Sequence, residues 1–545
     1  MATAIADRPE ILTSETEQAP SDLRLRYFCY AALVIVVVVF AGIRIRLRTA
    51  PLERDEGEYA YAGQLMLQGI PPYQLAYNMK LPGTYAAYAV MMAVFGQTLV
   101  GVRIGMLAVL LVNTLLLFLL TRKLFGLLAA TVAVASYTVL ANRLATMSLD
   151  GHATHFIVLP ALAGTLLLLH AIDTSRKSIL FLSGLCFGLA FLMKQHGIMF
   201  AAFGFLFWAW SEWRHSASWR KLITGCSILA AGIALPYLAT CLIIWRAGAF
   251  RQFWFWTIEY GSAYEKILNW GDLWLRFLII LPWFPRPLVI WLTAAFGLTA
   301  LFWNRRARKQ WVFVLSFTFF SIVAVCLGFY MRPHYFLVLL PAVAMLAGLG
   351  ISAAHEYLQE RGVSPAAAMI PVAFFVVSYL AALHGQRKYL FQMDPLKVHR
   401  QMHAAHGFAE ANAVADYIHN HTTDQDRIAV LGSEPEIYFY SGRHSATGYI
   451  YVYSLMEKQK FALRMQREMI REIEESNPKI IVYTDNQLSW GWEPGLNSLD
   501  PRTYIFNWMR DYLDAHYDLM AEVPIDKAGG FMWGFPCQYY IFQRK

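Results

Sequence analysis

Residues 27–59 read YFCYAALVIVVVVFAGIRIRLRTAPLERDEGEY, a long apolar run followed closely by a cluster of acids. A run of about twenty apolar residues is long enough to cross a bilayer as a single helix. Carboxylates are costly so close to a lipid boundary, and those that occur there usually have a functional role. This stretch therefore predicts a membrane span at 27–47 and a functional site immediately after it.

The apolar character continues along most of the chain. Hydrophobic residues make up 57% of the 545 residues and charged residues only 15%, which predicts a polytopic α-helical membrane protein surrounded by membrane lipids. Much of the net charge of +9 lies in short loops between apolar runs, where it sets topology, so we expect no nucleic-acid partner. We predict about 11 transmembrane helices, with a range of about 11–13. The predicted spans are 27–47, 100–120, 125–143, 152–170, 178–193, 197–210, 222–245, 285–303, 311–329, 335–352 and 365–382.

One further apolar stretch, 84–98, decides the predicted orientation. If it lies flat as an interfacial helix, the basic clusters between spans all fall on the same side as the basic N-terminus. If it crosses, every cluster moves to the other side. We therefore predict a cytoplasmic tail at 1–26 and place loop 48–99 on the outer face of a bacterial cytoplasmic (inner) membrane. The clusters are Arg122-Lys123, Arg176-Lys177, Arg214 with Arg220-Lys221, and Arg305-Arg306-Arg308-Lys309.

The sequence becomes less apolar after the last predicted span. Short apolar runs alternate there with amphipathic segments, a pattern typical of a small α/β domain. The region is roughly 150 residues long, which suffices for a core of its own. We predict a membrane domain at 27–389 and an extracytoplasmic (periplasmic) α/β domain at 390–545. Its expected strands are Arg427–Leu431, Lys479–Tyr483, 518–523 and 537–543, with a helix near 502–515.

Three short motifs carry a family resemblance: Glu53-Arg54-Asp55-Glu56, Met79-Lys80-Leu81-Pro82-Gly83-Thr84-Tyr85 and Ser148-Leu149-Asp150. In this order they resemble the opening third of the GT-C glycosyltransferases that use lipid-phosphate sugar donors. They are similar above all to the protein O-mannosyltransferase-like family and to the aminoarabinose transferases that modify lipid A. Relatives often carry Lys-Pro-Pro where this chain has Lys80-Leu81-Pro82. Further agreement comes from FLMKQ at 191–195, RPHYF at 332–336 and EPEIYFYSGR at 434–443.

The resemblance implies a GT-C fold and a membrane glycosyltransferase. Such an enzyme takes a sugar from a polyprenyl-phosphate donor and places it on a lipid, glycan or protein acceptor at the outer face, with inversion at the sugar. A transporter or flippase for polyprenyl-linked lipids or sugars is the alternative. Transporters usually carry ionisable groups near the bilayer midplane and often contain internal repeats. This chain concentrates its charges at the ends of spans, which favours the enzyme.

Sugar transfer from a polyprenyl phosphate requires a base for the acceptor hydroxyl and positive charge for the departing phosphate. We expect Asp55 to be the base, with Glu56 as a second candidate or an orienting group. Asp150, at the start of another span, is expected to orient the acceptor or to hold a metal. The competing interpretation is that both aspartates cap helices that start just after them. Glu53 and Glu58 are expected to contribute loop electrostatics or charge at a helix start.

Four cationic or polar residues are candidates for binding the donor phosphate. Lys80 and Lys194 lie at the predicted outer boundary, where a lipid headgroup would sit, and Arg332 and His334 add further lining. The alternative for each lysine is that it extends to the membrane interface without a partner.

Sugar or acceptor contacts are expected from Tyr59, Tyr61, Tyr85 and Glu434. Interfacial aromatic belts favour tyrosines at these positions in any case. Glu434 and Arg443 could equally form an ordinary surface ion pair.

A divalent metal ion is the one cofactor that the sequence suggests. Asp55, Asp150 and His152 are its candidate ligands, although His152 also fits an ordinary polar residue with satisfied hydrogen bonds at a span end. A second group of histidines has the spacing of one helical face, but an exposed linker helix would show the same pattern. These are His399, His403 and His406.

Overall fold

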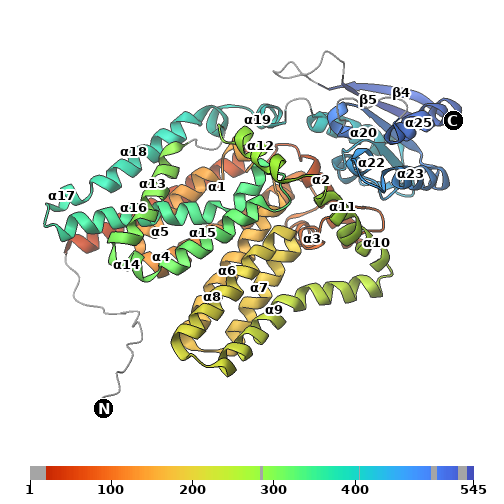
Figure 1. The fold of residues 1–545 in the computed structure, drawn as a ribbon. Coiled ribbons are helices and arrows are strands. Elements are labelled where there is room, and N and C mark those ends of the chain that lie inside the picture. The colour runs from red at the N-terminus through yellow and green to blue at the C-terminus, as the bar shows by residue number, and fades with distance from the viewer. Residues whose placement is uncertain (1–19, 283–286, 404–405, 492–499, 526–536) are drawn as a thin grey trace.

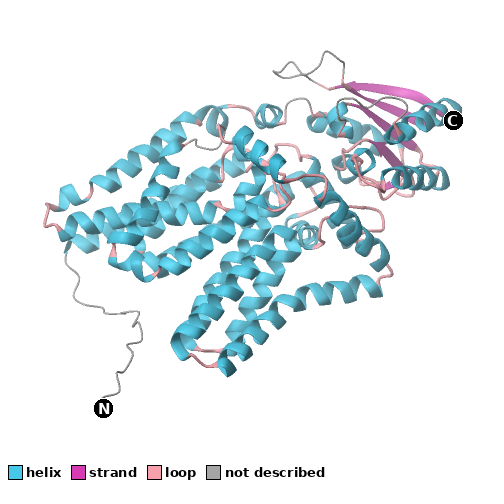
Figure 2. Ribbon diagram, in the orientation of Figure 1, coloured by secondary structure: helices cyan, strands magenta, loops and turns pink. Residues whose placement is uncertain are grey.

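The computed structural model describes residues 20–282, 287–403, 406–491, 500–525 and 537–545. A body of long helices forms most of the molecule, and a smaller unit built from the C-terminal residues sits against one end of it (Figure 1). All the strands that Figure 2 draws belong to this smaller unit. The molecule is therefore a helical body with one α/β unit attached.

Each predicted span coincides with helical structure over the residues described, and residues 285–286 of the predicted span 285–303 lie outside them. Within the described ranges, four helices are long and apolar enough to cross a bilayer, and shorter apolar helices of 10–17 residues accompany them. The chain is thus a membrane protein, while the number of crossings stays a prediction. The helices of the body are α1 (Pro20–Arg46), α4 (Leu99–Phe125), α5 (Leu127–Leu140), α6 (Ala153–Thr174), α7 (Lys177–Met193), α8 (Ile198–Ser216), α9 (Trp219–Arg246), α13 (Leu288–Trp303), α15 (Trp311–Cys326), α16 (Leu340–Glu360) and α18 (Ile370–Gly385).

Small residues let the long helices of the body pack closely. A Cβ atom on Gly184 of α7 would lie 2.5 Å from the carbonyl oxygen of Leu229 on α9, so only glycine fits there. Such contacts between small residues are typical of helices packed within a membrane. Outward-facing side chains such as Val34 and Ile243 are apolar and exposed, as lipid-facing residues are.

Helix α2 (Arg54–Leu67) starts inside the acidic cluster. Glu53 caps it: its carboxylate accepts a hydrogen bond from the Glu56 backbone N–H at 3.1 Å, and the Glu56 carboxylate accepts one from the Glu53 N–H at 3.2 Å. The capping interpretation of Asp55 is therefore wrong. It is also wrong for Asp150, because α6 begins at Ala153 without a side-chain cap.

Helix α3 (Gly83–Phe95) covers most of the ambiguous stretch 84–98 and packs against α2. Its side chains Tyr85 and Tyr88 share one apolar core with Ile428 and Val430 of the C-terminal unit. Helix α3 and the α/β unit thus lie at the same end of the body. The remaining elements at this end are α10 (Phe250–Trp254), a π-helix at Phe255–Tyr260, α11 (Gly261–Glu265), α12 (Trp270–Ile280) and a 3-10 segment at Pro333–Val338.

The C-terminal unit contains one five-stranded mixed sheet with strand order β2-β1-β3-β5-β4. The predicted strands are confirmed: β1 (Arg427–Leu431) runs parallel to β2 (His444–Ser445) and to β3 (Ile480–Asp485), while β5 (Gln538–Arg544) runs antiparallel to β3 and to β4 (Tyr517–Pro524). Strand β1 is buried because helices cover the parallel half of the sheet. These helices and their neighbours are α19 (Pro395–Met402), α20 (Ala411–His421), α21 (Glu436–Ser441), α22 (Tyr453–Met456), α23 (Ala462–Ser476), α24 (Gln487–Trp490) and α25 (Tyr504–His516).

Candidate active site

A cavity of about 200 Å³ lies where the helical body meets the C-terminal unit. Residues far apart in the sequence line it, and they include one predicted base and all four predicted phosphate ligands. Its walls also carry many aromatic rings from the segments after α9 and α15 and from the α/β unit. The predicted residues on the wall are Asp55, Lys80, Lys194, Arg332 and His334, and the aromatic ones include Trp256, Tyr260, Tyr264, Tyr330, Tyr335, Tyr451 and Tyr453.

Asp55 faces this cavity from the first turn of α2. Its Oδ1 atom lies 2.9 Å from Lys80 Nζ, and its Oδ2 atom lies 4.0 Å from His152 Nδ1. Burial is the largest single effect and acts to raise the pKa of Asp55, but Lys80, His152 and Arg332 together outweigh it, so the pKa lies below its usual range. Asp55 is therefore ionised at neutral pH, as a base must be.

Glu58 is the buried partner of Lys80, one helical turn along from Asp55. Its Oε2 atom lies 2.6 Å from Lys80 Nζ and also accepts a hydrogen bond from Asn78 Nδ2 at 2.8 Å, while its Oε1 atom accepts one from the Tyr85 hydroxyl at 2.5 Å. The expectation that Glu58 contributes only loop electrostatics is wrong, because Glu58 lies on a face of α2 that points into the protein. A fully bonded carboxylate thus holds Lys80 in the cavity wall.

Lys194 follows α7 and is a cation that lacks a carboxylate partner among the described residues. Its Nζ atom lies 4.0 Å from the centroid of the Tyr335 ring, a cation–π contact. Burial lowers the pKa of Lys194 to about 7, against the opposing effect of Asp55. A phosphate entering the cavity would supply the missing negative charge.

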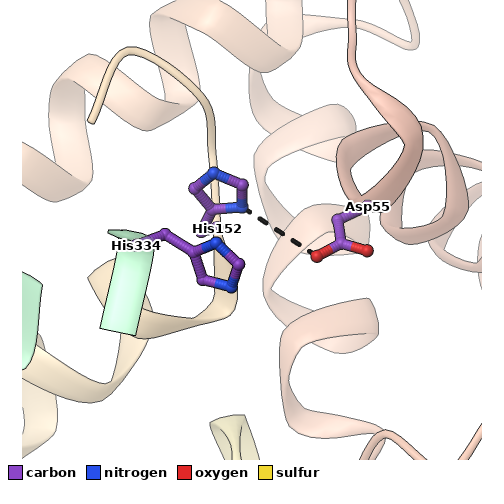
Figure 3. A group of neighbouring side chains, drawn as sticks. All are labelled: Asp55, His152 and His334. Atoms are coloured by element: carbon purple, nitrogen blue, oxygen red, sulfur yellow. Dashed lines mark ion pairs between the residues drawn. The ribbon is translucent and has the colours of Figure 1, made fainter. Parts of the chain in front are cut away.

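Asp55, His152 and His334 form a compact group that could hold a metal ion (Figure 3). One donor atom from each lies within 4.8 Å of the other two, and the two imidazole rings stack with their centroids 4.1 Å apart. Neither ring nitrogen of His152 has a hydrogen-bond partner among the described residues, so the expectation of a satisfied histidine is wrong. Burial lowers the pKa of His152 to about 4, which keeps the imidazole in the neutral form that binds metals.

Glu56 and Asp150 lie behind the cavity wall and join neighbouring segments. The Glu56 carboxylate pairs with Arg103 and accepts a hydrogen bond from the Gly151 N–H at 2.5 Å. Asp150 Oδ2 lies 3.0 Å from His403 Nε2 and 3.8 Å from His152 Nε2. Both carboxylates therefore hold the loop before α6 against α2 and against the start of the C-terminal unit.

The three histidines at 399, 403 and 406 do not share a helical face. Helix α19 ends at Met402, so only His399 lies within it. His403 contacts Asp150 instead, and His406 stacks on Phe408 with the ring centroids 5.0 Å apart. The expected helix is too short to align the three rings.

The three candidate tyrosines pack inside the protein rather than on the cavity wall. Tyr85 bonds to Glu58, Tyr61 stacks on the ring of Tyr438 in the α/β unit, and the ring of Tyr59 lies 4.6 Å from Lys80 Nζ. They support the residues of the site from behind.

Glu434 also lies behind the cavity wall, in the interface between the α/β unit and α2. Its Oε2 atom accepts hydrogen bonds from the hydroxyls of Thr484 and Ser489, each at 2.8 Å. Arg443 pairs with Asp424 instead, and both Glu434 and Arg443 are buried. The alternative of a surface ion pair between Glu434 and Arg443 is therefore wrong.

Sequence reasoning missed the part of the cavity wall that comes from the α/β unit. Tyr451, Tyr453 and Glu457 line the cavity there. The available signal was the aromatic run YIYVYS at 449–454, which closely follows the family-like segment 434–443. Its contribution depends on how the α/β unit docks, which no local pattern encodes.

Comparison with known proteins agrees with this architecture. Residues 80–244 match the family described as dolichyl-phosphate-mannose-protein mannosyltransferase. The chain is 28% identical over 346 residues to the undecaprenyl phosphate-alpha-4-amino-4-deoxy-L-arabinose arabinosyl transferase of Pseudomonas aeruginosa, a match that covers 59% of this chain. The chain spans about half of that relative, 51% of its length.

Two solved structures have the same fold. The crystal structure of ArnT from Cupriavidus metallidurans bound to undecaprenyl phosphate has a TM-score of 0.54 at 15% identity and covers 96% of this chain and 98% of its own. The archaeal oligosaccharyltransferase AglB from Archaeoglobus fulgidus, in complex with an inhibitory peptide and a dolichol-phosphate, has a TM-score of 0.51 at 12% identity and covers 84% of this chain and 70% of its own. The chain is thus similar in sequence to glycosyltransferases that use lipid-phosphate sugars, and it has the GT-C fold of these two solved structures.

Proposed function

We propose that this protein transfers a sugar from a polyprenyl-phosphate donor to a lipid, glycan or protein acceptor, with Asp55 as the general base. The observation that carries the proposal is the pairing of charges in one cavity. An ionised carboxylate stands beside Lys80, and Lys194 and Arg332 line the same cavity. Sugar transfer from a phosphate donor requires this combination, a base for the acceptor hydroxyl and cations for the departing phosphate.

In the proposed reaction, the acceptor hydroxyl oxygen attacks the anomeric carbon of the donor sugar. The bond from this carbon to the phosphate oxygen breaks, and both of its electrons leave with the phosphate. Asp55 takes the hydroxyl proton. A single displacement of this kind inverts the configuration at the anomeric carbon.

The lowered pKa of Asp55 is compatible with this role. It keeps the carboxylate ionised before the reaction, and the acceptor hydroxyl becomes strongly acidic only as its oxygen bonds to the sugar. Proton transfer to Asp55 therefore becomes favourable late in the displacement. The departing phosphate is already a good leaving group, so cations suffice on that side and no general acid is required.

The names of the similar proteins support the class of donor. One names an undecaprenyl phosphate sugar and the matched family a dolichyl phosphate sugar, and both are polyprenyl phosphates. The sugar and the acceptor differ between the two names. Mass spectrometry of lipids, glycans and glycoproteins from cells with and without the protein tests the proposal, which fails if no sugar-bearing molecule differs between them.

We place the cavity and the α/β unit on the outer face of the bacterial cytoplasmic membrane, with the N-terminus in the cytoplasm. The shared core of α3 and the α/β unit supports an interfacial α3 rather than a crossing one. The basic residues between the long helices then lie in the cytoplasm. A membrane-impermeant thiol reagent should label a cysteine introduced at exposed Asp424 in intact spheroplasts. Labelling of this cysteine only after lysis would show that the α/β unit faces the cytoplasm.

We further propose that Asp55, His152 and His334 hold a divalent cation. Two neutral imidazoles and one carboxylate suit Zn²⁺, Mn²⁺ or Fe²⁺, and the unpartnered His152 nitrogens fit this use. When bound, such an ion would add positive charge beside the donor phosphate. The purified protein should therefore contain about one metal ion per chain by elemental mass spectrometry, and H152A together with H334A should remove it. H419A, on the surface of α20, should not change the metal content, and equal content in all variants would exclude this site.

The pKa of Lys194 predicts how donor use depends on pH. A bound phosphate stabilises the charged ammonium, whereas the free site holds Lys194 with a pKa of about 7. As pH rises above 7, the free enzyme loses this charge and kcat/KM for the donor should fall. Lys194→Arg should remove this decline because a guanidinium stays charged throughout the range. The same decline in the arginine variant would show that another group titrates.

A further inference from the structure

The guanidinium of Arg54, the residue before Asp55, is buried inside the α/β unit. Its Nε atom donates to the Ser433 carbonyl at 2.7 Å, its Nη2 atom donates to the Leu488 carbonyl at 3.3 Å, and its Nη1 atom donates to the Tyr453 hydroxyl. Glu434 Oε1 lies 4.0 Å from Nη2. The guanidinium carbon also lies 4.8 Å from the centroid of the Tyr453 ring. Arg54 thus has a complete set of partners outside its own helix.

These partners lie where an α/β domain ordinarily binds a ligand. Strands β1 and β3 are parallel neighbours that end at Leu431 and Asp485, and the contacts at Ser433 and Leu488 come just after those ends. The crevice beyond the carboxyl ends of parallel strands is the usual ligand site of such sheets. Here a side chain from the helical body fills that position.

The α/β unit also contacts α2 on either side of Arg54. A Cβ atom on Gly57 would lie 2.5 Å from the backbone nitrogen of Glu436, so α2 and α21 meet backbone to backbone. The Leu52 N–H donates to the Tyr440 hydroxyl at 2.8 Å just before α2 begins. Asp55 stands between these contacts, and its direction follows from how α2 is seated.

Arg54 also connects to the cavity wall. Its guanidinium lies against Tyr451 and Tyr453, which both line the cavity that Asp55 faces. We propose that the α/β unit captures Arg54 at its strand ends and thereby positions both the base and the aromatic wall. Arg54 is a positioning residue in this scheme, since it does not itself line the cavity. The functional part of this inference rests on the proposed transferase activity.

The contact set requires an arginine. Three separate nitrogens bond to three separate segments while the guanidinium lies over an aromatic ring, and a lysine ammonium cannot reproduce that geometry. Displacement of the base should lower the catalytic rate, because an error of about 1 Å in placement can reduce the rate by about 100-fold.

The test compares full-length R54A, R54K and the control R443A in detergent or nanodiscs. Arg443 is a second buried arginine of the α/β unit, bonded to Thr422 and Asp424 away from the cavity. We expect R54A to lower kcat by about 100-fold and R54K by about tenfold, whereas R443A keeps its kcat per folded molecule. Millimolar guanidinium should partly restore R54A by refilling the crevice and should leave R443A unchanged. Wild-type rates in R54A, or a loss of kcat in R443A equal to that of R54A, would overturn the proposal.

Hydrogen exchange provides a readout that does not depend on activity. In R54A the amides at the start of α2 and in the 449–454 loop should exchange faster, and guanidinium should restore their protection. Unchanged exchange in both segments contradicts the positioning role even if no sugar transfer is ever found. Absence of transfer in the wild-type protein, with the exchange result intact, instead refutes only the proposed activity.

Discussion

Asp55→Asn is expected to reduce sugar transfer by about 1,000-fold, which is the contribution of a general base. The amide keeps the size of the carboxylate but cannot accept the acceptor proton at neutral pH. Lys80 retains its second partner, Glu58, at 2.6 Å, so the variant should still fold. The measurement is transfer of a labelled sugar from a polyprenyl-phosphate donor by the purified protein.

Asp173→Asn is the matched control for Asp55→Asn. Asp173 also pairs with a lysine, Lys123, at 2.6 Å, but this pair lies outside the cavity. Its transfer rate should equal that of the wild type. Transfer by the Asp55 variant at the parental rate would refute the assigned base, and movement of polyprenyl-linked sugar across vesicles without transfer would favour a flippase.

Lys80→Gln is expected to produce the second large effect, on both stability and activity. Removal of the ammonium leaves Asp55 and Glu58 without the cation that both of them contact. Breaking a buried ion pair costs about 3 kcal/mol of folding free energy. Loss of positive charge beside the donor phosphate should also lower kcat/KM by about 100-fold.

Thermal unfolding and donor titration separate these two effects. Lys80→Arg retains the charge and should recover most of the stability. Any loss of activity that remains in this variant then reports on the geometry of the site rather than on its charge. Lys123→Gln removes a lysine from the ion pair with Asp173 outside the cavity and should change neither quantity by much, since that pair is partly exposed. Equal stability and donor use in Lys80→Gln and Lys123→Gln would contradict the role given to Lys80.

The helical body was predictable because its signal is local. Apolar runs of membrane-spanning length identify a helix wherever they occur, and each predicted span coincides with one. Strands β1, β3, β4 and β5 follow from short apolar runs in the same way, whereas β2 (His444–Ser445) contains no such run and was not predicted. Helix starts were less predictable, since Glu53 rather than Asp55 caps α2 through a reciprocal bond with Glu56.

The cavity residues were predictable only in part, because some of them are positioned by tertiary contacts that no local pattern encodes. Asp55, Lys80 and Lys194 stand at the ends of apolar runs, so membrane geometry alone brings them to one boundary. Glu58 and Arg54 have their partners in Asn78 and in the α/β unit, which are fixed by tertiary contacts. Sequence pattern therefore locates the charges, while docking of the C-terminal unit decides which of them face the cavity.

A structure of the wild-type protein with undecaprenyl phosphate would test directly whether this cavity binds the donor phosphate. We expect the phosphate to lie within hydrogen-bond distance of Lys194 and Arg332, in the cavity that Asp55 faces. Asp55 should keep its contact with Lys80. A phosphate bound elsewhere, with Lys194 and Arg332 unoccupied, would contradict the assignment of this cavity as the site of sugar transfer.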